Sequence, residues 1–146
     1  MRTNRFFDRL SMFFNPGYLI TLDVNDVDKT VLDKIIAILK ANHFILVQEI
    51  AHPVRRGYLL ASYLRSIASE RNNCINATCH YPKAEYPEKR LESLRVVLQN
   101  EVRGREPAIK SKMDELADLV VNEISKYVRK ESIFVTRRNT SPQSSA

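Results

Sequence analysis

The segment at residues 107–128 is the sequence feature that most constrains the fold. Its apolar side chains recur at steps of three and four residues, so at about 100° per residue they share one face of a helix roughly 33 Å long. Pro107 suits the first helical position, because the missing N–H of proline leaves no donor unsatisfied there. The apolar face comprises Ile109, Met113, Leu116, Val120, Ile124 and Tyr127. Such a helix must pack on a flat apolar surface, and we expect a sheet beneath it.

The composition is that of a globular protein with one domain. The 146 residues are 44% hydrophobic and 27% charged, and a chain of this length buries most of the apolar surface that its unfolded form exposes. No run approaches the roughly 20 apolar residues of a membrane helix, so we expect no transmembrane span. Arg5, Asp8 and Arg9 interrupt any apolar core of a secretory signal. We therefore expect a cytoplasmic location, or an envelope or periplasmic one if a leader has been removed.

The formal net charge of +6 favours anionic partners such as nucleic acid. The positive charge is spread over short clusters rather than gathered in one patch. Arginine side chains in loops contact phosphates without reading base sequence. The candidate anion-binding residues are Arg55, Arg56, Arg103 and Arg105.

Residues 1–16 form a separate amphipathic segment ahead of the domain. Its large apolar side chains stand on one helical face with arginines interleaved, and a turn at residues 15–17 ends it. The apolar face comprises Phe6, Phe7, Leu10, Phe13 and Phe14. One interpretation is a short helix that packs on the domain. The other is a basic amphipathic segment that rests on a membrane surface or binds a protein partner.

Four segments have the alternation or the apolar, β-branched composition of strands: residues 18–24, 44–50, 94–99 and 132–136. A helix that Asn25 or Asp26 caps runs to about residue 41. Residues 58–69 favour a short helix, with a strand as the alternative, and residues 70–90 are predicted to be irregular. The polar tail at residues 138–146 is predicted to be disordered.

The order of elements is β-α-β, an insertion at about residues 52–91, and a second β-α-β, within one domain at residues 17–137. Two such units with right-handed crossovers predict an α+β, ferredoxin-like split βαβ sandwich, with a four-stranded antiparallel sheet and both main helices on one face. The alternative is an open α/β sheet in which the 58–69 helix is a crossover. The similarity to ferredoxin-like domains is one of architecture, and a fold alone does not determine a function.

The sheet face away from the two helices is predicted to be too apolar to stay fully hydrated. The apolar residues that strand alternation places there are Leu19, Ile45, Val47, Val97 and Phe134. We expect the N-terminal helix, the 58–69 segment or another subunit to cover this face.

Cys74, Cys79 and His80 form the densest cluster of reactive side chains. They offer three metal ligands, but structural zinc sites pair cysteines at closer spacing and repeat the pair, which this chain does not. A disulfide would close a small loop in an oxidising compartment. Two free thiols in a surface loop are the plain alternative. The sequence leaves these three interpretations open.

Signatures of catalysis are missing from the sequence. The three glycines are too far apart for a phosphate-binding loop, and neither a Gly-x-Ser-x-Gly elbow nor a His-Glu-x-x-His motif occurs. We assign no catalytic residue and no cofactor. The sequence leaves enzymatic activity uncertain and favours a non-enzymatic role.

Excess apolar surface favours a small protein-interaction or assembly module. It would associate with itself or with a partner protein through the apolar sheet face or the Phe-rich N-terminal segment. The alternative is a basic protein that binds nucleic acid or another anion through its arginine-bearing loops. A second alternative is a peripheral, envelope-associated domain.

Overall fold

The structure is a computed structural model that describes residues 17–64, 73–83, 90–100 and 107–139. The described elements, in chain order, are β1 (Tyr18–Asp28), α2 (Lys29–Ala41), β2 (Ile45–Ala51), β3 (Arg55–Leu64), β4 (Asn73–Pro82), β5 (Arg90–Asn100), α3 (Pro107–Ile124), the 3₁₀ helix η1 (Lys130–Ser132) and β6 (Ile133–Asn139). Among these residues, neither α2 nor α3 has the length and apolar character of a membrane-crossing helix.

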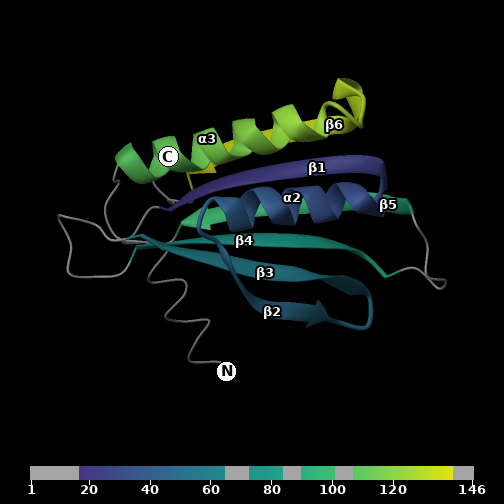
Figure 1. Cartoon of the computed structure of the whole chain (residues 1–146), viewed down its shortest axis with the longest axis horizontal. Helices are drawn as coiled ribbons and strands as arrows, with labels where there is room; N and C mark the ends of the chain where they lie inside the picture. Colours follow the sequence, from purple (N-terminus) through teal and green to yellow (C-terminus); the bar gives the residue numbers. More distant parts are fainter. Residues whose placement is uncertain (1–16, 65–72, 84–89, 101–106, 140–146) are drawn as a thin grey trace, which may run out of the picture.

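The six strands form one open antiparallel sheet in the order β2-β3-β4-β5-β1-β6 (Figure 1). The α+β class is therefore confirmed, but the predicted four-stranded, ferredoxin-like sheet is wrong. The difference arises in the predicted insertion, where two long strands, β3 and β4, extend the sheet by antiparallel pairing.

The strand β3 occupies most of the stretch for which the sequence favours a helix. Leu60 is fully buried beneath the helices, whereas Leu59 beside it is half-buried on the other side of the sheet. Gly57 leaves room for the backbone of the paired strand β4, because a Cβ atom there would overlap the carbonyl oxygen of Cys79. The alternative interpretation of residues 58–69, as a strand instead of a helix, is therefore correct as far as Leu64.

The strand β4 runs through residues that were predicted to be irregular. Ile75, Ala77 and Cys79 are fully buried on the side of the helices. Asn76, Thr78 and His80 alternate with them and are half-buried on the other side. This strict alternation is that of a strand with one core face. Two of its core residues are small, which weakens the hydrophobic signal.

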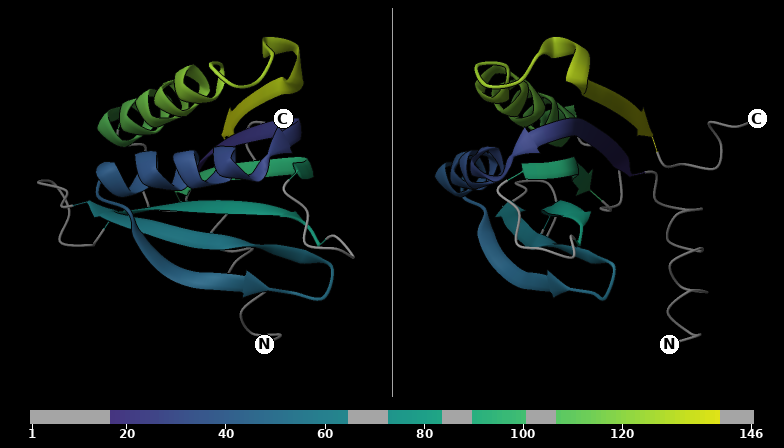
Figure 2. Two further views of the ribbon diagram at one scale, coloured as in Figure 1. Left: turned by 45° about the vertical axis from the view of Figure 1, so that its right-hand side comes forward. Right: turned by 90° about the vertical axis from the view of Figure 1, so that its right-hand side faces the viewer.

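Both helices lie on the same side of the sheet, which curves around them (Figure 2). The core forms between the helices and the strands β1, β3, β4 and β5. The fully or almost fully buried side chains of the helices are Val31, Leu32, Ile35 and Leu39 of α2 and Met113, Leu116, Ala117, Val120 and Ile124 of α3. These residues recur at helical spacing, as an amphipathic helix on a sheet requires.

The ends of the helices differ slightly from the expected positions. Asp28 caps α2, since β1 extends to this residue and Asp28 Oδ1 accepts a hydrogen bond from the Thr30 N–H at 2.9 Å. The second helix begins at Pro107 as predicted but ends at Ile124. A turn follows, so Tyr127 lies outside the core and is 53% exposed.

Candidate functional site

The sheet face turned away from α2 and α3, called the far face below, is more polar than the sequence predicted. The pairing registers place Leu19, Val97 and Phe134 on it, as expected. Ile45 pairs with Ala61 on the same side, and Val47 lies at a β-bulge between Leu46 and Gln48. The added strand β4 contributes Asn76, Thr78 and His80 to this face. The far face therefore combines apolar and polar side chains.

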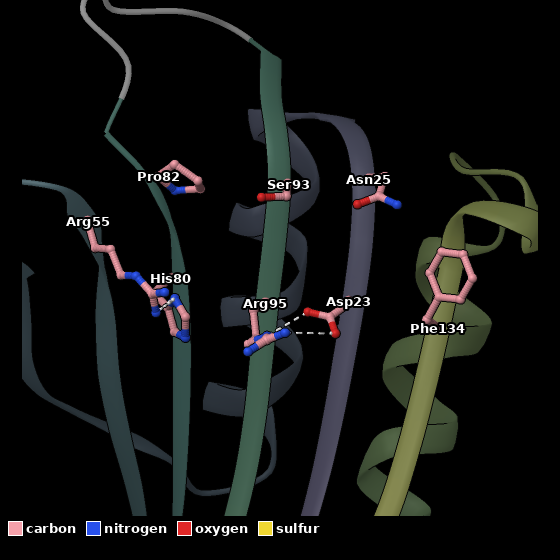
Figure 3. Close-up of a pocket in the computed structure, with 8 residues that line it drawn as sticks. All are labelled: Asp23, Asn25, Arg55, His80, Pro82, Ser93, Arg95 and Phe134. Carbon is pink, nitrogen blue, oxygen red and sulfur yellow. Dashed lines mark hydrogen bonds and ion pairs between the residues drawn. The ribbon is translucent and has the colours of Figure 1, made fainter.

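A pocket of about 430 Å³ lies on the far face (Figure 3). Five different strands contribute to its lining, which is formed by Asp23 and Asn25 of β1, Arg55 of β3, His80 and Pro82 of β4, Ser93 and Arg95 of β5, and Phe134 of β6. Its charged groups are two arginines and one aspartate, so its formal charge is positive while His80 is neutral. We call it the far-face pocket.

Strand register aligns four of the lining residues in one row across the sheet. His80 pairs with Arg95, Arg95 with Asp23, and Asp23 with Phe134. Neighbouring strands are about 4.8 Å apart, so this row extends over roughly 14 Å. Arg55 comes from β3 and reaches the His80 end of the row, as Figure 3 shows. The row therefore presents donors at one end and an aromatic ring at the other.

The two arginines have different environments. Arg95 donates to Asp23 twice, from Nε to Oδ1 at 2.7 Å and from Nη2 to Oδ2 at 3.2 Å. Arg55 lies with Nη1 at 3.4 Å from His80 Nδ1. Among the described residues, Arg55 has no carboxylate partner. Its charge is therefore the less compensated of the two.

Burial lowers the pKa of His80, and the positive charges of Arg55 and Arg95 lower it further against the opposing effect of Asp23. A neutral imidazole that accepts a hydrogen bond from Arg55 at Nδ1 carries its proton on Nε2. His80 then acts as a second donor in the pocket.

The edge strand β2 exposes the largest group of neighbouring apolar side chains in the described sheet. Ile45, Leu46 and Val47 are 56%, 48% and 49% exposed. The strand pairs only with β3 among the described strands. Natural proteins usually protect such edges with lysine, proline or a bulge, because an unpaired edge recruits other strands. Here a bulge is present, but no lysine or proline occurs within β2.

Cys74 and Cys79 are not joined in a disulfide. They lie on opposite sides of β4, since they are an odd number of positions apart on one strand. Cys79 is fully buried, and burial raises the pKa of its thiol to about 12. Cys74 Sγ lies 3.4 Å from Asn76 Oδ1. No metal-binding group of three or more His, Cys, Asp or Glu side chains exists within the described ranges.

The predicted arginine set is divided by the fold. Arg55 lines the far-face pocket, whereas its neighbour Arg56 pairs with Tyr81 on the side of the helices. Arg103 and Arg105 lie outside the described residues, as does the predicted N-terminal face of Phe6, Phe7, Leu10, Phe13 and Phe14. The grouping of Arg55 with Asp23, Arg95 and Phe134 was not predicted. Alternation indicates their common side, but only the register places them in one row.

No protein-family model matches the chain, and no curated protein shows significant similarity to it. The β2 edge and the far-face pocket are the two surfaces of the described residues that suit a binding partner.

Proposed function

We propose that this protein is a non-enzymatic assembly module that pairs with a second copy of itself through the edge strand β2. The observation that supports this proposal is the run of three exposed aliphatic residues, Ile45, Leu46 and Val47, at the end of the sheet. A second strand alongside β2 would satisfy its outer backbone N–H and C=O groups and remove these side chains from water.

The sequence of β2 suits pairing with itself. In an antiparallel pair centred on Leu46, a two-fold axis would bring Ile45 of one copy beside Val47 of the other. The apolar side chains would then meet one another across the axis. Glu49 would lie away from the axis, so the two copies would not place like charges face to face.

The size of this surface predicts a dimer of low affinity. Fully burying an aliphatic side chain contributes about 1.5–3 kcal/mol, so burying the exposed half contributes roughly 1 kcal/mol per side chain. Three such side chains from each copy, together with backbone hydrogen bonds of about 1 kcal/mol each, oppose an association cost of about 4–15 kcal/mol. The sum of these gains exceeds only the lower end of that cost, so we expect a weak dimer with a dissociation constant on the order of tens of micromolar.

Sedimentation velocity over about 1–200 µM tests this proposal, because the range brackets micromolar affinity. We expect the intact chain to change from monomer to dimer with rising concentration. Val47→Lys places a charge on the edge and should leave only monomer. Leu119→Lys is the matched control, because Leu119 is 47% exposed but lies on α3. A monomer at every concentration, or equal loss of dimer in both variants, would contradict the proposal.

A further inference from the structure

We infer that the far-face pocket binds a phosphate group attached to an aromatic ring system, that is, a nucleotide, either free or within a single strand. The inference concerns a surface different from the β2 edge and does not depend on dimer formation. It rests on the donors at one end of the pocket, the exposed ring at the other, and the row that joins them.

Both arginines that line the pocket have guanidinium N–H groups without a partner among the described residues. Asp23 engages Nε and Nη2 of Arg95, which leaves Nη1 without a partner among the described residues. Arg55 uses Nη1 toward His80, and its Nε and Nη2 have no partner within the same ranges. Guanidinium N–H groups in this fork geometry match the oxygens of a phosphate.

The carboxylate of Asp23 holds the guanidinium of Arg95 in place rather than blocking the pocket. The two hydrogen bonds between them are side-on, so they fix the plane of the guanidinium over the sheet. An arginine that is already ordered loses less conformational freedom when a ligand binds. Figure 3 shows Arg95 between the Arg55–His80 pair and Phe134. A phosphate placed between Arg95 and the Arg55–His80 pair would accept hydrogen bonds from both arginines.

Phe134 supplies the aromatic half of the site. Its side chain is 54% exposed, and it pairs in register with Asp23 at the end of the row. The strands β6 and β5 are separated by β1 alone, so Phe134 is about 10 Å from Arg95 across the sheet. A base stacked on Phe134 would direct its phosphate toward the arginines. Stacking on an exposed ring beside a positive groove is the way in which sheet faces bind single strands without reading their sequence.

The pair Asp23–Arg95 alone would be an ordinary cross-strand ion pair of a sheet surface. It does not account for Arg55 and Phe134, which are both exposed on the same face, and Arg55 forms no ion pair among the described residues. The net charge of +6 would also draw a polyanion toward the protein.

The test is fluorescence anisotropy with a fluorescein-labelled deoxythymidine oligonucleotide of about ten nucleotides, at low salt, where phosphate contacts are strongest. Unlabelled AMP and inorganic phosphate serve as competitors. Displacement by AMP identifies a site for free nucleotides. Oligonucleotide binding without displacement by AMP identifies a site for single strands. Both outcomes support the inference. If neither the oligonucleotide nor AMP binds, the inference is overturned.

Two matched pairs of variants locate the site. Arg55→Gln and Arg56→Gln change the total charge equally, but only Arg55 lies on the far face. We expect Arg55→Gln to weaken oligonucleotide binding about five- to tenfold, since it removes hydrogen bonds to a charged group, and Arg56→Gln to weaken it less than about twofold. Equal loss in both variants would show binding by overall charge and would overturn the inference.

The second pair tests the aromatic ring. Phe134→Leu keeps an apolar side chain but removes the ring, and we expect about five- to tenfold weaker binding. Tyr127→Leu is the control, because Tyr127 is equally exposed but lies beyond the end of α3. If Phe134→Leu binds like the wild type, or if inorganic phosphate displaces the oligonucleotide as well as AMP does, the nucleotide assignment is wrong. Circular dichroism of each variant establishes that the fold is intact.

Discussion

Arg95 on β5 donates two side-on hydrogen bonds to Asp23 on β1, so one carboxylate both orients this arginine and offsets its charge. Asp23→Asn keeps an oxygen acceptor for Arg95 but removes the negative charge from the far-face pocket. We expect oligonucleotide affinity to rise about two- to fivefold at low salt. Stability should fall by less than about 1 kcal/mol, because the pair is largely exposed.

Asp118→Asn is the matched control for this variant. Asp118 pairs with Arg137 at 3.0 Å on the opposite side of the sheet, so its replacement changes the total charge equally. An equal gain of affinity in both variants would mean that overall charge alone sets the binding. Anisotropy titrations of the two variants side by side decide between these outcomes.

Gly57 controls how closely β3 and β4 approach. In Gly57→Ala the new Cβ would overlap the carbonyl oxygen of Cys79, so the two strands must separate. We expect the free energy of unfolding to fall by about 1–3 kcal/mol, the usual cost of overpacking. Urea denaturation measures this loss. Ala51→Ser on the exposed strand β2 is the control and should change stability by less than about 0.5 kcal/mol.

The two thiols should react at very different rates. Cys79 is fully buried and burial raises its pKa to about 12, so it forms almost no thiolate near neutral pH. In Cys74→Ser, we expect no reaction with Ellman's reagent until urea unfolds the chain. In Cys79→Ser, the half-buried Cys74 should react in the folded protein. Rapid labelling of Cys79 in folded Cys74→Ser would show that β4 is not packed as described.

The lowered pKa of His80 makes stability depend on pH. The imidazole of His80 binds a proton less readily in the folded protein than in the unfolded chain. The contribution of neutral His80 to the free energy of unfolding is therefore fully present above the ordinary pKa of 6.5. It is lost progressively as the pH falls from there through the folded pKa. Urea denaturation between about pH 7.5 and 5 should show that the free energy of unfolding decreases as the pH is lowered. His80→Gln should make this dependence on pH less steep. An unchanged slope in His80→Gln would contradict the assignment.

Protonation of His80 should have the opposite effect on ligand binding. The charged groups that face it are Arg55 from β3, Arg95 from β5 and Asp23 from β1. A phosphate near these groups favours the protonated imidazole, so oligonucleotide affinity should rise as the pH falls. The rise should disappear in His80→Gln. Anisotropy titrations at constant ionic strength measure it, and a rise that survives the substitution would assign it to another group.

Local sequence patterns predicted most elements but not the way in which they join. The strands near residues 18–24, 44–50, 94–99 and 132–136 and the helix that begins at Pro107 are present. The two missed strands have specific causes. In β3, Leu60 and Leu64 are spaced as on a helix, and in β4 the core positions Ala77 and Cys79 are small. Periodicity is therefore ambiguous in both segments, and long-range pairing decides their structure.

The candidate site was predictable only in part. Strand alternation places Phe134 and Arg95 on the same face, but Arg55 was assigned to a loop and was not connected with either of them. Their grouping depends on the order of five strands and on the register of each pair. A shift of one residue in any strand would move its member of the row to the other face. No local pattern encodes these registers.

The place of β1 between β5 and β6 also has a consequence for synthesis on the ribosome. The first described strand pairs with the last two, and β6 lies at the end of the described chain. During synthesis, β1 emerges long before its partners β5 and β6. Pairing of β1 with them closes a long loop of chain, and the entropic cost of this closure slows folding. The nascent sheet therefore stays incomplete on the side of Phe134 until β6 has been synthesised.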